Sequence, residues 1–163
     1  MKTDHVDNIL QQWAVERPDL DVSPMAVTGR IAQISAFFKT EMQKTFALYD
    51  LNHASFDLLA TLLRSGPPYA LPPGDLLASA MVTSGTMTNR IDRLQQAGLV
   101  DRKQCVIDKR SYWISLTDAG HELISEAITE HVATLHRIVA SMPQQDLESL
   151  SRLLRQLVPT AES

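Results

Sequence analysis

The stretch of residues 72–116 places the tightest limits on how this chain can fold. It reads PPGDLLASAMVTSGTMTNRIDRLQQAGLVDRKQCVIDKRSYWISL. Pro73 suits the first position of a helix, where its missing N–H costs nothing. Leu76 and Leu77 give this short helix one apolar face. The chain then breaks at residues 82–85, so the stretch begins with a short helix and a tight turn.

A second helix is predicted after this break, running to about residue 97. Met87, Ile91 and Leu94 recur at the spacing of one apolar stripe, and Gly98 suits the left-handed geometry on which helices commonly end. The opposite face carries short polar side chains with guanidinium groups further along, namely Ser84, Thr86, Thr88, Asn89, Arg90 and Arg93. Such a face can approach base edges in a DNA major groove, where asparagine suits adenine and arginine suits guanine or a phosphate. An ordinary solvated helix face is the alternative.

A β-hairpin is predicted next, with strands at residues 99–104 and 112–116. Both strands are rich in β-branched and aromatic residues, namely Val100, Tyr112, Trp113 and Ile114. The tip carries Asp108, Lys109 and Arg110. A cation on such a tip suits the narrow, strongly negative minor groove of A·T-rich DNA, and Asp108 can orient Arg110 through a charge-assisted hydrogen bond. A charged turn in water is the alternative. Together the two helices and the hairpin form a winged helix-turn-helix pattern.

Four short motifs follow one another in this part of the chain. They are R-L at 93–94, G-L-V at 98–100, D-K-R at 108–110 and L-T-D-A-G at 116–120. In this order they resemble the MarR family (multiple antibiotic resistance regulators), and the layout of predicted helices is similar to that family from residue 23 to residue 158. The motifs are specific as a set, although each one alone is weak.

The resemblance implies a mainly α fold with a small β-hairpin wing, in which a winged helix-turn-helix is flanked by N- and C-terminal dimerisation helices. We expect residues 1–163 to form a single domain. Within it, residues 1–49 and 117–163 would form the helical dimerisation region, and residues 50–116 the winged helix-turn-helix DNA-binding region.

Hydrophobic spacing predicts further helices on both sides of the winged segment. They are expected at about residues 4–16, 24–49, 52–64 and 117–142, with a final helix after Pro143. This last helix repeats leucine at near-heptad spacing, at Leu147, Leu150, Leu153, Leu154 and Leu157. Such a stripe must be buried against something. Packing within the chain is one possibility, and the resemblance implies a second subunit instead.

The resemblance implies a function in transcription regulation. We expect a homodimeric repressor that binds a palindromic operator in double-stranded DNA, with half-sites about one helical turn (~34 Å) apart. A small aromatic or phenolic ligand is expected to release this repressor from the operator. Apolar candidates for that ligand's site are Phe38, Met42, Phe56, Met81 and Trp113, for each of which a place in the core is the simpler interpretation. A dimeric winged-helix adaptor that binds protein is the alternative function.

Charge distribution is consistent with a DNA-binding segment inside an acidic chain. The net charge is −4, but residues 67–116 hold six basic and four acidic residues, which gives +2 there and −6 elsewhere. The five histidines lack the spacing of a metal site, and no hydrolase, Walker or dinucleotide-binding motif occurs. We therefore expect no metal, no cofactor and no enzymatic activity.

The remaining features favour a cytoplasmic protein. No apolar run reaches the ~18 residues of a membrane helix, so no membrane partner is expected, and the N-terminus does not resemble a secretory signal. One cysteine, Cys105, excludes an internal disulfide and fits a reducing compartment. A nearby lysine favours the thiolate, yet we expect Cys105 to be a small strand residue without a redox role.

Overall fold

The computed structural model describes residues 3–79, 84–104 and 112–159, with the backbone alone at 84–86. The described residues form seven helices and three strands, so the mainly α prediction with a small wing is confirmed. The chain divides into two compact units, residues 1–44 and 45–163. The assignment of one part to dimerisation and another to DNA binding stays a prediction.

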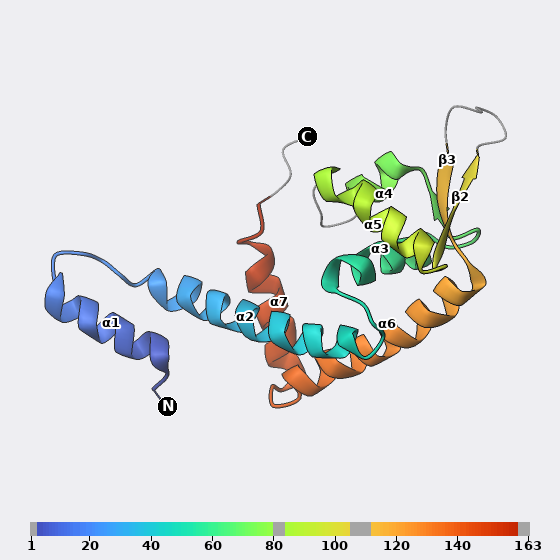
Figure 1. The fold of residues 1–163 in the computed structure, drawn as a ribbon. Helices are drawn as coiled ribbons and strands as arrows, with labels where there is room; N and C mark the ends of the chain where they lie inside the picture. Colours follow the sequence, from blue (N-terminus) through green and yellow to red (C-terminus); the bar gives the residue numbers. More distant parts are fainter. Residues whose placement is uncertain (1–2, 80–83, 105–111, 160–163) are drawn as a thin grey trace. The chain divides into compact units, whose positions relative to one another are not determined.

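The first unit consists of α1 (His5–Glu16) and most of α2 (Met25–Ala47) (Figure 1). A capping box starts α1, because Asp4 and Asp7 each accept the other's backbone N–H at 2.9 Å. Arg30 of α2 donates to both carboxylates, at 2.8 Å to Asp4 and 2.6 Å to Asp7. The amide of Asp7 and the guanidinium of Arg30 hold the pKa of Asp4 below its usual range. The start of α1 is thus tied to α2.

The second unit contains the winged segment and the C-terminal helices (Figure 1). Its elements in chain order are α3 (His53–Arg64), β1 (Ala70–Leu71), α4 (Pro73–Ser79), α5 (Ser84–Gln96), β2 (Val100–Gln104), β3 (Tyr112–Leu116), α6 (Asp118–Val139) and α7 (Gln144–Arg155). The predicted boundaries lie within a few residues of these. Asn52 caps α3 and Thr117 caps α6 through their side-chain oxygens.

The sheet has one strand more than the predicted hairpin. Its order is β1-β3-β2, and both pairings are antiparallel. β1 pairs Ala70 with Ser115 and Leu71 with Ile114. The sequence did not reveal β1, because it has only two residues and stands among four prolines, which normally interrupt regular structure. β1 adds a partner for β3 on the side away from β2.

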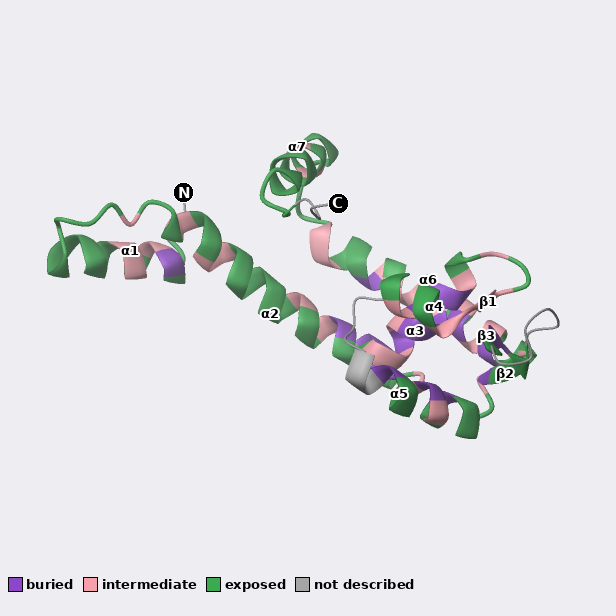
Figure 2. Cartoon of the chain, turned by 90° about the horizontal axis from the view of Figure 1, so that it is seen from above, coloured by how far each residue is buried: buried purple, intermediate pink, exposed green. Residues whose placement is uncertain are grey.

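The core of the second unit forms around α3. Leu58, Leu59 and Leu62 of α3 are completely buried, and Figure 2 shows buried residues gathered on α3 and on the elements around it. Further buried aliphatic residues come from neighbouring elements, and they include Leu76, Met87, Ile91, Leu94, Val100, Ile114 and Ile124. The apolar stripe predicted at Met87, Ile91 and Leu94 therefore faces this core, as expected.

An aromatic stack lies beside that core. The ring of Phe46 stacks on Phe56 at 4.1 Å between centroids, and His131 of α6 lies 5.6 Å from Phe46 and 4.9 Å from Phe56. The Nδ1 atom of His131 is buried and has no hydrogen-bond partner in the described part of the chain. Burial, with a smaller contribution from His53, lowers the pKa of His131. The stack thus favours a neutral imidazole.

The elements α5, β2 and α6 meet at a close junction. The Thr117 hydroxyl donates to the carbonyl of Gly98 at 2.7 Å and accepts the N–H of Gly120 at 3.0 Å. The Thr117 N–H donates to the carbonyl of Leu99 at 3.2 Å. Gly98 has a φ of +71°, which glycine adopts without strain. A Cβ at position 120 would lie 1.9 Å from the Leu99 oxygen. We call these four residues the corner.

Gly120→Ala should destabilise the chain, because the added methyl group cannot fit against a backbone carbonyl. We expect a loss of about 1–3 kcal/mol in the free energy of unfolding, measured by urea denaturation. Gly74→Ala is the matched control, since a Cβ there meets no atom within 4 Å. If both variants unfold at the same urea concentration, the close contact at Gly120 does not limit stability.

Stability should fall below neutral pH because of His131. Its pKa is lowered in the folded chain, so as pH falls through about 6.5 the unfolded state takes up the proton first. The stabilisation present above pH 6.5 is then lost as pH approaches the lower, folded pKa. Melting temperatures between pH 7.5 and 5.5 should fall less steeply in His131→Phe than in the native chain. His136→Gln, at an exposed site on the same helix, should keep the native slope; equal slopes in all three proteins would contradict this assignment.

Candidate nucleic-acid interface

The α5 helix presents one buried and one exposed face. Met87, Ile91 and Leu94 are buried against the core, whereas Thr88 and Asn89 are exposed. Arg93 is also exposed, one helical turn further along. Burial of the apolar stripe fixes which side chains point outward, so the short polar face expected from the sequence is available to a ligand.

Arg90 differs from the other residues predicted on this face. It is only half-exposed, and its Nη1 atom is buried with no hydrogen-bond partner among the described residues. A buried guanidinium N–H cannot reach a base or a phosphate without moving. Of the two arginines, Arg93 is therefore the better placed for contact with a nucleic acid.

Several predicted residues lie outside the described part of the structure. They are Met81, Cys105, Asp108, Lys109 and Arg110, together with the side chains of Ser84 and Thr86. Strand β2 ends at Gln104 and strand β3 begins at Tyr112, and these two residues pair in register. The predicted tip segment therefore connects two paired strand ends.

The helix before α5 is fixed by a side chain of α3. The Nη2 atom of Arg64 donates to the carbonyl oxygen of Ser79, the last residue of α4, at 2.5 Å. A cation near a helix C-terminus also favours the helix dipole. The guanidinium of Arg64 therefore holds the end of α4.

A second arginine connects α5 to the sheet. Arg102 of β2 donates from Nη1 to Gln95 Oε1 at 3.0 Å and from Nη2 to the carboxylate of Asp92. Its guanidinium carbon lies 5.7 Å from the ring centroid of Tyr112 on β3. We call this group of residues the clamp. Sequence reasoning missed it, although Asp92 and Gln95 lie three residues apart on one helix face.

Comparison with known proteins identifies the family. The sequence model of the MarR family matches residues 51–112. The HTH-type transcriptional regulator PecS of Dickeya dadantii is 41% identical over 149 residues, which cover 91% of this chain and 90% of PecS. The chain belongs to the MarR family. It is a DNA-binding transcriptional regulator with a winged helix-turn-helix, and it is not an enzyme.

Solved structures of two bacterial DNA-binding proteins have a similar fold. Sco3205 of Streptomyces coelicolor, solved in complex with DNA, has a TM-score of 0.75 and 21% identity, and the match covers 85% of this chain and 87% of Sco3205. BpsR of Bordetella bronchiseptica has a TM-score of 0.70 and 20% identity, with 80% and 91% covered. BpsR was solved to explain how 6-hydroxynicotinic acid regulates its DNA binding.

The described residues of this MarR-family chain hold no group of three or more His, Cys, Asp or Glu side chains that is suited to a metal ion. None of the described helices is long and apolar enough to cross a membrane.

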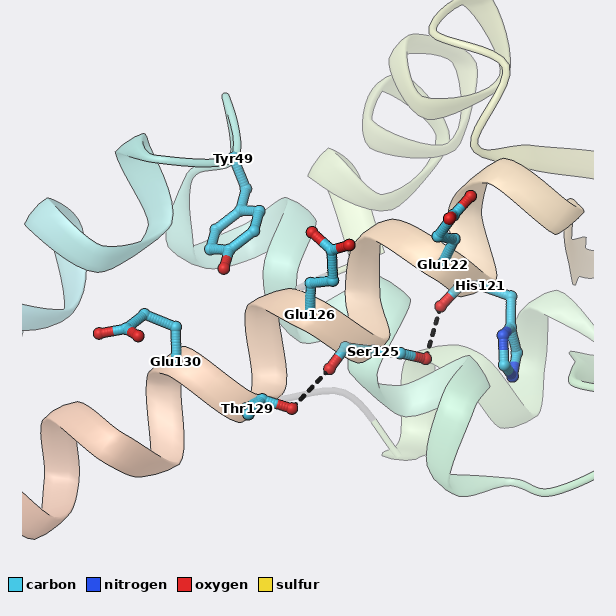
Figure 3. Close-up of a pocket in the computed structure, with 7 residues that line it drawn as sticks. All are labelled: Tyr49, His121, Glu122, Ser125, Glu126, Thr129 and Glu130. Carbon is cyan, nitrogen blue, oxygen red and sulfur yellow. Dashed lines mark hydrogen bonds between the residues drawn. The ribbon is translucent and has the colours of Figure 1, made fainter.

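A hollow on the surface of α6 is acidic. Figure 3 shows three glutamates along α6, Glu122, Glu126 and Glu130, with Tyr49 among the lining residues. The hollow has a volume of about 630 Å³. The hydroxyls that line it bond back to the helix: Ser125 donates to the carbonyl of His121 at 2.6 Å, and Thr129 to that of Ser125 at 2.9 Å. Three carboxylates disfavour DNA and aromatic acids alike.

The apolar residues predicted to line a ligand site have different environments. Phe56 belongs to the aromatic stack, Met42 is buried and Phe38 is half-buried. Trp113 is 38% exposed and lies on the wing, where it pairs with Lys103 of β2. None of them lines the acidic hollow on α6.

Proposed function

We propose that this MarR-family chain is a homodimeric repressor of a palindromic operator, and that a small aromatic ligand relieves the repression. The observation that carries the proposal is the exposed polar face of α5, where Thr88, Asn89 and Arg93 lie opposite the buried apolar stripe. Insertion into a major groove requires a helix that is held in place by its buried face and carries short polar side chains on its exposed face, and α5 has both properties.

Some of the proposed contacts are with bases and others are with phosphates. Asn89 would pair with adenine through two hydrogen bonds, and Arg93 would reach guanine or a phosphate. The other proposed contacts come from Ser84, Thr86, Arg90, Lys109 and Arg110. Arg90 would have to leave its half-buried position. Arg110, oriented by Asp108, would enter the minor groove, where the negative potential is strongest in A·T-rich DNA.

A protein-binding adaptor is the second candidate, because aromatic side chains are exposed on the wing. Tyr112 is 40% and Trp113 38% exposed, and aromatic anchors are common in protein interfaces. The exposed residues described on α5 include no such anchor. This difference favours DNA as the partner of α5.

The proposal of a homodimer is supported by the exposed leucines of α7. No residue of this helix is buried among the described residues, and Leu150, Leu153 and Leu154 are 39%, 51% and 38% exposed. A helix of 12 residues is marginal alone in water and needs packing along its apolar side. We propose a second copy of the chain as the partner, since two copies would present two α5 helices to a palindrome.

The proposal of an aromatic effector is supported by the similarity to BpsR, because the DNA binding of BpsR is regulated by 6-hydroxynicotinic acid. By linkage, such a ligand would weaken DNA binding only to the extent that it prefers the non-binding shape of the dimer. Phe38, Met42, Met81 and Trp113 stay candidates for its site. Phe56 is the weakest candidate, because a ligand there would have to open the aromatic stack.

Selection of bound fragments from genomic DNA, followed by binding measurements on the selected site, tests the DNA proposal. Arg110→Ala should weaken binding to all sequences and flatten the salt dependence, whereas Asn89→Ala should mainly relax base choice at one position, each by ~1–3 kcal/mol. The affinity of the native chain should fall steeply with salt, because bound Lys and Arg displace counterions.

Arg152→Ala is the matched control, since it removes an exposed cation from α7. It should leave both affinity and base preference close to native values. If no duplex binds the native chain, even in dilute buffer, the DNA proposal is wrong. If duplexes bind but both Asn89→Ala and Arg110→Ala bind like the native chain, the residue assignments are wrong.

Replacement of two leucines on α7 tests the homodimer. The native chain should sediment with the mass of two 18.1 kDa chains. Leu150→Glu combined with Leu153→Glu should raise the dimer dissociation constant by more than tenfold, because each leucine buried at an interface contributes about 1.5–3 kcal/mol. Gln145→Glu adds charge on the opposite, polar side of α7 and should remain dimeric. A native chain that sediments as a monomer would overturn the proposal.

A further inference from the structure

We infer that Arg102 is a positioning residue that holds the wing at a fixed distance and angle from α5, and so determines how far specific DNA binding exceeds non-specific binding. The inference rests on the proposed function, in which α5 and the wing tip contact DNA together. Nothing in the family comparison assigns a role to this arginine.

The geometry of the clamp supports a positioning role. One guanidinium contacts two residues of α5, Asp92 and Gln95, and lies against the ring of Tyr112 on β3. A planar guanidinium with several N–H donors can hold two acceptors at once, whereas a lysine ammonium lacks that fixed fork. Arg102 thus connects the helix to both long strands of the wing.

The position of the clamp along α5 and the wing is also important. Asp92 directly precedes Arg93, which we propose as a DNA contact. Arg102 sits on β2 two residues before Gln104, which pairs with Tyr112 where the described strands end. The clamp lies between the two proposed contact sites, where a small change in angle moves the tip relative to α5.

Preorganisation gives the clamp its expected effect on DNA binding. A specific site needs α5 and the wing tip in one relative geometry, and a wing that moves freely must be ordered at the moment of binding. Non-specific binding depends mainly on the sum of positive charge near phosphates. Loss of the clamp should therefore lower specific affinity and leave non-specific affinity governed by charge alone.

Asp92 provides the decisive test, because two roles for Arg102 predict opposite results. If Arg102 positions the wing, Asp92→Asn should weaken specific binding although it removes a negative charge close to DNA. If Arg102 is instead a phosphate contact that Asp92 restrains, the same substitution should free the guanidinium and tighten binding. The clamp ion pair is partly exposed. Neither Asp92→Asn nor Arg102→Ala therefore leaves an unpaired charge buried in the core.

The control for Asp92→Asn is Asp101→Asn. Asp101 is an exposed acid on β2, beside Arg102 in sequence but on the opposite face of the sheet, and no ion pair involves it in the described part of the chain. It changes the net charge equally without touching the clamp. Lys103→Ala is the corresponding control for Arg102→Ala, since it removes a cation from the same strand.

The experiment measures affinities of the full-length variants for the selected operator and for an unrelated duplex, across a range of salt concentrations. We expect Arg102→Ala and Asp92→Asn each to lower the ratio of specific to non-specific affinity by about fivefold to twentyfold, and the double variant to lower it no further than the worse single variant. The two controls should shift both affinities together and leave the ratio unchanged. The slope of log affinity against log salt should be native in Asp92→Asn and Arg102→Ala.

Two outcomes would overturn the inference. One is tighter operator binding by Asp92→Asn that matches Asp101→Asn; the other is a salt slope reduced by about one in Arg102→Ala, which marks a lost phosphate contact. Melting curves identify any loss of folding, which would reduce the active fraction for both duplexes and preserve the ratio. A native chain that binds no duplex would instead overturn the proposed function itself.

Discussion

The contact between Gly120 and the Leu99 carbonyl is the constraint on which the rest of the second unit depends. With room for a hydrogen atom only, the first turn of α6 lies directly on the turn that joins α5 to β2. Thr117 completes this corner, since its hydroxyl both caps α6 and bonds the Gly98 carbonyl. The end of α5, the start of the wing and the start of α6 therefore meet at one rigid point.

The corner explains why the α5 helix can present polar side chains without losing its position. Its apolar stripe is buried against the core, its C-terminal end is fixed at the corner, and Arg102 ties its last turns to β2. The end of α4 is held independently by Arg64 of α3. Because backbone contacts and buried residues supply this support, the exposed face that we propose as the DNA contact takes no part in holding the helix in place.

Spacing predicted the helices and the buried stripe, because burial of one helix face leaves a period that is visible in a single sequence. The L-T-D-A-G motif marked the start of α6. The need for a glycine in this motif, however, is explained only by the contact with Leu99, about 20 residues earlier. The two-residue strand β1 and the clamp could not be predicted from the sequence, for the same reason. Each depends on a pairing between distant segments, and neither Ala70 nor Arg102 differs locally from a loop or surface residue. The half-burial of Arg90 likewise depends on tertiary packing.

The rigidity of this unit limits how a ligand can act on DNA binding. Because α5 is fixed at the corner to α6 and to the wing, a change in the shape of its exposed face, the proposed DNA contact, would break buried contacts. In the proposed dimer, a ligand meets less resistance if it changes the distance between two intact α5 helices. Half-sites about one turn (~34 Å) apart tolerate little error in that distance. We therefore expect an effector to contact the helices that join the two copies, and α5 to keep its structure when the operator is released.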